Sequence, residues 1–175
     1  MPRALPVSNE RHIDEFQILP RKGMLYQLQG PGHSGKSMRE FAEAWTAMTL
    51  MNGDYVHWID GACRFNPARI IQTFPHTLPD CEQLLHGLFV GRGFTVHQFS
   101  HLVQRLQAEI KITKAKLIVV DGPLTMHLDP QIGNYEARSL FRKTIDLLKK
   151  IADENDVGIV LITSSKVHSR RHSHL

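Results

Sequence analysis

Short apolar runs alternate along the chain with longer segments whose apolar side chains recur at helical spacing. Five runs have the composition of strands, namely residues 24–29, 54–60, 88–91, 116–121 and 157–163. Residues 117–120 are apolar throughout, as in a parallel sheet that is covered on both faces. Because strands and helical segments alternate, we predict an α/β fold whose mainly parallel five-stranded sheet is flanked by helices.

Apolar spacing and stop signals mark the helical segments. After the first strand, the pattern predicts a helix that ends near Asn52-Gly53 and buries one stripe of side chains. That stripe consists of Met38, Phe41, Ala42, Trp45 and Met48. The other predicted helices span residues 9–16, 67–74, 79–86, 97–110 and 136–154.

The segment between the first strand and its helix matches G-x-x-x-x-G-K-[ST], the pattern of a phosphate-binding loop. Its residues are Gly30, Pro31, Gly32, His33, Ser34, Gly35, Lys36 and Ser37. The glycines allow the backbone to turn successive N–H groups onto a phosphate, at the start of a helix that already favours an anion. A strand before the loop and a helix after it are the context that this motif requires. We therefore predict a nucleotide site.

An acid at the end of a neighbouring buried strand completes a site of this kind. Asp121 directly follows the apolar run 117–120. We expect the Ser37 hydroxyl and Asp121, the latter through water, to hold Mg²⁺, while Lys36 brings positive charge to the β- and γ-phosphates as the catalytic cation. The predicted cofactors are ATP and Mg²⁺.

Composition limits the class of protein. At 175 residues the chain forms one domain, with an N-terminal segment (1–23), a core (24–163) and a histidine-rich basic tail (164–175). No apolar run approaches the ~18 residues of a membrane span, and residues 1–10 lack the apolar centre of a signal peptide. Cys63 and Cys81 have no metal-site spacing and are interpreted as reduced thiols. We expect no membrane contact and a cytoplasmic location, or a nuclear one in a eukaryote.

The tail is the clearest candidate for contact with an anionic polymer. The formal net charge is +4, and the tail contains Lys166, Arg170 and Arg171 without any acid. Such a segment suits contact with a nucleic-acid backbone without sequence readout. A solvated chain end fits the same composition equally well.

The order of these motifs resembles the RecA-like recombinase ATPases, in particular the archaeal RadA and eukaryotic recombinase paralogue branch. Beyond the two phosphate-site motifs, three stretches carry the resemblance. They are residues 58–69, with Phe65, Pro67 and Arg69 at the family's offsets, residues 92–98, and residues 136–163. The resemblance covers residues 18–167.

The resemblance implies a P-loop NTPase with a RecA-like core over residues 24–163. It also implies a role in homologous recombination and DNA repair, with single-stranded DNA and a partner recombinase or second copy as partners. Two loops hold DNA in this family. The first corresponds to residues 122–135, which contain no Lys or Arg but offer Met126 and Tyr135, and the second corresponds to the tail.

Departures from the family pattern point to weak hydrolysis. The family places a catalytic glutamate two residues beyond Asp60, where this chain has Ala62. Loss of such a base typically lowers the rate by ~10²–10⁴, and Asp60, acting through water, is the remaining candidate. Ser164-Ser165 occupy the position of a γ-phosphate sensor. The helical DNA-binding domain of full recombinases has no counterpart here, so we expect either a minimal paralogue or part of a longer protein.

Two functions from other classes use the same loop. A small-molecule kinase would need an arginine-bearing lid and an acceptor pocket, for which no segment of the sequence is convincing. A regulatory ATPase would bind nucleotide without contacting DNA. Binding of single-stranded DNA across a salt series separates the recombinase paralogue from the regulatory ATPase. Phosphorylation of a supplied nucleoside or sugar would indicate a kinase.

Overall fold

The computed structural model describes residues 19–32, 35–167 and 169–175. Its sheet has five strands, all parallel to their neighbours, in the order β1-β5-β4-β2-β3. The strands are β1 (Leu25–Gly30), β2 (Val56–Asp60), β3 (Leu88–Arg92), β4 (Leu117–Asp121) and β5 (Gly158–Ser164). The predicted α/β fold with a parallel five-stranded sheet is confirmed. The helix predicted at residues 9–16 lies outside the described residues, as do His33 and Ser34.

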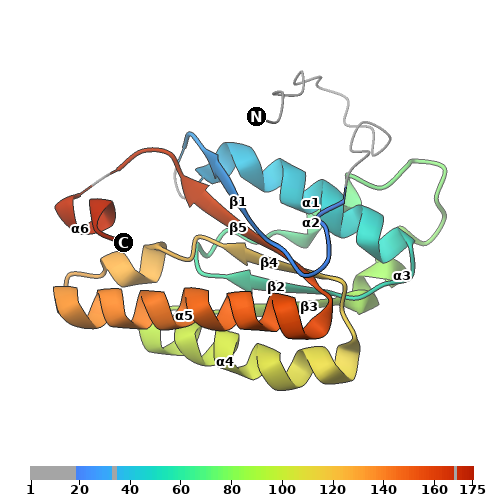
Figure 1. Ribbon diagram of the computed structural model, residues 1–175. Helices are drawn as coiled ribbons and strands as arrows, with labels where there is room; N and C mark the ends of the chain where they lie inside the picture. The colour runs from blue at the N-terminus through green and yellow to red at the C-terminus, as the bar shows by residue number, and fades with distance from the viewer. Residues whose placement is uncertain (1–18, 33–34, 168) are drawn as a thin grey trace.

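Helices cover both faces of this sheet (Figure 1). Helix α1 (Lys36–Met51) lies on one face, and α4 (Val96–Thr113) and α5 (Asn134–Asn155) pack side by side on the other. Short helices occupy the connections: α2 (Pro67–Ile71), α3 (Cys81–Leu84), η3 (Leu85–Gly87), η4 (Thr125–Leu128) and α6 (Arg170–Ser173). In the part of the chain that the structure describes, no helix combines the length and the apolar composition needed to cross a membrane.

Alternation along the central strands divides the core into two layers. Ile118 and Val120 pack in the cluster that contains the buried residues of α4 and α5. Leu117 and Val119 pack instead with Trp58 of β2 and the apolar residues of α1. Because side chains alternate between the faces of a strand, Asp121 falls on the α1 face. The acid that ends β4 is thus on the same side of the sheet as the helix that follows the predicted phosphate loop.

The predicted buried stripe of α1 is confirmed in part. Ala42 is buried, and Met38 and Trp45 are half-buried but pack against the core of this face, whereas Phe41 and Met48 are half-buried. The buried positions of α1 are Arg39, Ala42, Glu43, Ala44, Thr46, Ala47, Thr49 and Leu50. Two polar side chains, Arg39 and Glu43, are also buried on this helix, and they lie within ion-pair distance of Asp121 and Arg69. Apolar spacing alone does not reveal such positions.

The phosphate loop is packed against the end of β5. Gly35, the residue before α1, has φ +76°, and a Cβ at this position would lie 2.3 Å from the Thr163 carbonyl oxygen. The Ser165 N–H donates to the Gly30 carbonyl (2.8 Å). The Ser164 hydroxyl donates to the Gly32 carbonyl (3.1 Å). Together these contacts fix the path of the loop before α1 begins.

A comparison of two glycines tests this packing. Gly53 has φ +79° and nothing within 4 Å of an added Cβ, so Gly53→Ala introduces left-handed strain alone. That strain costs roughly 1–2 kcal/mol. Gly35→Ala adds a steric overlap with backbone, and we expect it to lower the free energy of unfolding by about a further 1–3 kcal/mol. Urea denaturation measures both variants. Equal losses would mean that the loop does not pack on β5 as described.

Candidate functional site

The carboxyl ends of the parallel strands meet at one edge of the sheet. In register, Gly30 at the end of β1 pairs with Ser164 of β5. Asp60 at the end of β2 pairs with Asp121 of β4. Ligands of open parallel sheets bind at this edge, where loops and helix starts converge. The predicted loop and the two predicted acids therefore share one site.

The described part of the loop has the backbone of a phosphate cradle. Gly32 and Gly35 have φ values of +91° and +76°, which turn the chain sharply before α1. Lys36 is the first residue of α1 and is exposed, so its ammonium group is free to extend toward a phosphate. The Ser37 hydroxyl donates to the Pro31 carbonyl at 3.0 Å, which closes the loop on itself. This arrangement suits an anion at the start of a helix.

Asp121 lies at the predicted edge of the sheet and on its α1 face, but Arg39 holds both of its oxygens. Arg39 Nε lies 2.5 Å from Asp121 Oδ2, and Arg39 Nη2 lies 2.9 Å from Oδ1. The side chains are 2% and 0% exposed, so this is a buried, bidentate ion pair. Burial acts to lower the pKa of Arg39, but its hydrogen bonds to Asp121 and the neighbouring carboxylates raise it overall. Burial raises the pKa of Asp121, and Arg39 opposes that rise.

This pairing bears directly on the predicted Mg²⁺ site. A divalent cation needs carboxylate oxygens that are not already engaged by another cation, and both oxygens of Asp121 are engaged. Within the described ranges, no three His, Cys, Asp or Glu side chains are grouped so as to bind a metal ion. In this arrangement the residues do not fit a cation on Asp121. Direct ligation of a cation by Asp121 is thus not supported by its hydrogen bonds, while the predicted contact through water stays a prediction.

Asp60 is also fully committed to local structure. One oxygen accepts from the Arg64 N–H (3.0 Å), and the other accepts from the Phe65 N–H (3.0 Å) and from Arg92 Nε (2.9 Å). The carboxylate is 0% exposed and holds the turn that leads into α2. The proposed catalytic role, in which Asp60 activates water, is disfavoured because neither oxygen is free.

Ala62 lies beside the end of β4. It is 6% exposed. A Cβ added to Gly122, the residue after Asp121, would lie 2.7 Å from the Ala62 Cβ. The neighbouring Gly61 N–H donates to the Asp121 carbonyl at 2.8 Å. The position that the resemblance assigns to a catalytic glutamate is therefore at the site, and it carries a methyl group.

Residues 169–175 form a folded end. Ser169 caps α6, and its hydroxyl accepts from the His172 N–H at 3.1 Å. Arg171 Nε donates to Asn134 at 2.6 Å, and its Nη1 donates to the Asp129 carbonyl at 2.5 Å. These contacts join α6 to the start of α5 and to the segment before it, and Figure 1 shows α6 near that end of α5. Of the three predicted DNA-binding cations, Lys166 and Arg170 are exposed, whereas Arg171 binds other parts of the protein.

The loop after β4 also presents one of its two predicted contact residues. Tyr135 is 88% exposed, whereas Met126 packs against the core between α4 and α5. The fold buries His127 between Phe99 and Phe141 in edge contacts, with Nδ1 2.8 Å from the Pro123 carbonyl. Burial lowers the pKa of His127, and its hydrogen bond to the Pro123 carbonyl opposes that shift.

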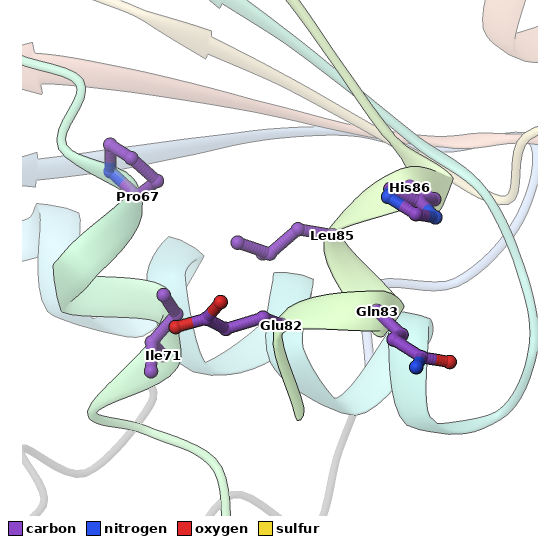
Figure 2. Close-up of a pocket in the computed structure, with 6 residues that line it drawn as sticks. All are labelled: Pro67, Ile71, Glu82, Gln83, Leu85 and His86. Atoms are coloured by element: carbon purple, nitrogen blue, oxygen red, sulfur yellow. The ribbon is translucent and has the colours of Figure 1, made fainter. Parts of the chain in front are cut away.

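A separate pocket of about 480 Å³ lies between α2 and α3. Figure 2 shows its lining, with Leu85 projecting between the two helices and the Glu82 carboxylate near Ile71. The full lining is Pro67, Ile71, Glu82, Gln83, Leu85 and His86. None of the residues predicted for the phosphate site lines this pocket, so it does not belong to that site.

Sequence reasoning missed Arg39 and Arg92, the two cations that bind the buried acids. One sequence signal could have revealed Arg39. It is an arginine on the part of the predicted helix that apolar side chains do not cover and that faces the sheet, opposite a strand that ends in Asp121. No signal for the Asp60–Arg92 pair was available, because it depends on β3 lying beside β2.

Comparison with known families agrees with this geometry. The Rad51 family model matches residues 45–173, well over half of the chain. The match runs from within α1 to α6 and includes Asp60, Ala62 and Asp121. Residues 30–37 precede the matched range, so the assignment of the phosphate loop depends on its own motif and geometry. The family acts in DNA recombination and repair, and its fold is the RecA-like P-loop fold. The chain therefore belongs to the Rad51 family of RecA-like recombinases.

Proposed function

We propose that this protein is an ATP-binding recombinase paralogue that assists homologous recombination and DNA repair. It binds single-stranded DNA and a partner recombinase, or a second copy of itself, and hydrolyses ATP slowly at most. The observation that carries the proposal is the phosphate cradle as described at residues 30–32 and 35–37, tied to β5 at the edge of a Rad51-family sheet.

The proposal of nucleotide binding rests on how the cradle is built. Its glycines are required by positive φ at Gly32 and by the close approach of Gly35 to β5. Lys36 is exposed at the start of a 16-residue helix, whose N-terminus attracts negative charge. A glycine-rich turn without a ligand would not need this combination of strain, packing and an exposed lysine.

Slow hydrolysis follows from the acids at the same edge. Asp60 and Asp121 are both held by arginine, and position 62 has no carboxylate. General-base catalysis requires a group within hydrogen-bond reach of the attacking water. We infer that bound ATP acts as a switch that stabilises one association state, since a ligand shifts an equilibrium through its preference for one state.

The DNA contact is proposed on the surface around α6. Lys166 and Arg170 are exposed, and Arg171 links α6 to Asn134, the residue before the exposed Tyr135. Cations beside an aromatic ring suit a single strand, because they bind its phosphates while a base stacks on the ring. A regulatory ATPase and a small-molecule kinase are the alternative outcomes of the experiments below.

Nucleotide uptake is tested with Lys36→Ala. Titration with a fluorescent ATP analogue should show binding by the wild type and a loss of affinity of roughly tenfold or more in Lys36→Ala, because the phosphates lose their positive partner. Lys22→Ala is the matched control. Lys22 is an exposed lysine that pairs with Asp156 at 3.5 Å, near the start of β1 and away from the cradle. Equal affinity in all three proteins would overturn the assignment of the cradle.

The catalytic position is tested with Ala62→Glu. A carboxylate at this place supplies the missing base, and we expect the steady-state rate of ATP hydrolysis to rise by ~10-fold or more. Ala62→Gln has almost the same size without the charge and should leave the rate unchanged. A rate that is the same in all three proteins, at equal nucleotide affinity, would show that position 62 is not catalytic.

DNA binding is tested by fluorescence anisotropy with labelled single-stranded DNA over a salt series. Each phosphate contact contributes about −0.7 to the slope of log affinity against log salt. Replacing Lys166 and Arg170 by Ala should therefore make the slope shallower by about 1.4. Replacing Lys149 and Lys150, exposed at the far end of α5, removes the same charge and should change the slope much less. If the protein did not bind single-stranded DNA even at low salt, the regulatory ATPase would be the remaining function.

A further inference from the structure

The acids on the α1 face of the site are each matched with an arginine of the protein. Asp121 binds Arg39, and Asp60 binds Arg92 at 2.9 Å. Glu43, one turn after Arg39 on α1, lies 3.7 Å from Arg69. This edge is thus already charge-balanced by guanidinium groups, where a nucleotide site of this kind is expected to leave a carboxylate for a metal ion.

Arg39 differs from the other two arginines in its burial. Arg92 and Arg69 are 39% and 41% exposed, so each has a path to solvent. Arg39 is 2% exposed and is held beneath α1 by two hydrogen bonds to one carboxylate. Removing it from Asp121 would leave a buried guanidinium without an anion, which is strongly unfavourable. Direct coordination by Asp121 would also require Mg²⁺ to lose water, which it does reluctantly.

We propose that Arg39 is the fixed counter-cation of Asp121, and that the cradle takes up nucleotide without a divalent cation bound to that carboxylate. Arg39 is a positioning residue: it lies one turn after Lys36 and ties the start of α1 to the end of β4. The inference about nucleotide rests on the proposed ATP binding. The pairing itself is testable without nucleotide.

The first experiment compares nucleotide affinity in excess MgCl₂ with affinity in EDTA. We expect the two dissociation constants of the wild type to agree within about threefold, and the same ratio in Asp121→Asn. The proposal would be overturned if the dissociation constant of the wild type in EDTA exceeded that in MgCl₂ by about tenfold or more and this difference disappeared in Asp121→Asn. Asp121 would then hold the metal. If the wild type binds no nucleotide at all, the proposed function fails, and the second experiment alone decides the pairing.

The second experiment is a double-mutant cycle on thermal unfolding without nucleotide. Arg39→Gln and Asp121→Asn should each lower the Tm by about 4 °C or more, while the double variant recovers much of the loss. MgCl₂ should raise the Tm of Arg39→Gln, whose Asp121 is released for a cation, but not that of the wild type or the double variant. Additive losses, or a wild type stabilised by MgCl₂ as much as Arg39→Gln, would overturn the proposal.

Two further variants keep the cycle interpretable. Arg39→Lys retains the charge but loses the two-pronged contact, so it should unfold at a lower Tm than the wild type and show no response to MgCl₂. It replaces Arg39→Gln if that variant does not fold, and a Tm equal to that of the wild type would contradict the bidentate pairing. Arg142→Gln, at an exposed position on α5, removes the same charge and should leave the Tm unchanged.

Discussion

The buried ion pair between Arg39 and Asp121 is the contact on which the site depends. It joins the first turn of α1 to the end of the central strand β4, and so it fixes the helix that carries Lys36 relative to the sheet. A buried pair of this kind is a weak source of net stability but a strong constraint on geometry, since neither partner tolerates losing the other. The packing of Gly35 on β5 supplies the second fixed point of the loop.

Near these two contacts, the groups that are proposed to bind a phosphate differ in their surroundings from the acids that would act on it. Lys36 is exposed at the helix start, and the Gly35 and Ser37 N–H groups donate within the loop, whereas both strand-terminal acids are paired with arginines. Position 62 holds a methyl group beside Gly122. Membership of the Rad51 family therefore accounts for the fold and for a role in recombination and repair, while the proposal that nucleotide is bound and slowly hydrolysed rests on these details of the site.

Much of the fold was predictable because its signals are local. The apolar run that ends at Asp121 defines a buried strand, and the spacing within residues 136–154 defines most of α5. The loop motif fixed where β1 ends and α1 begins. Parallel connectivity then required the loop, Asp60 and Asp121 to meet at one edge.

The sequence by itself determined the order of elements, the phosphate loop and the edge at which the acids lie, because period, glycines and strand ends are written in consecutive residues. The tertiary structure decided the partners of those acids. Arg39 is 82 residues from Asp121, and Arg92 is 32 residues from Asp60. It also buried Arg39 and Glu43 on α1 and folded α6 against α5. Hydrogen bonds between distant segments depend on how layers pack, and no local pattern records that packing.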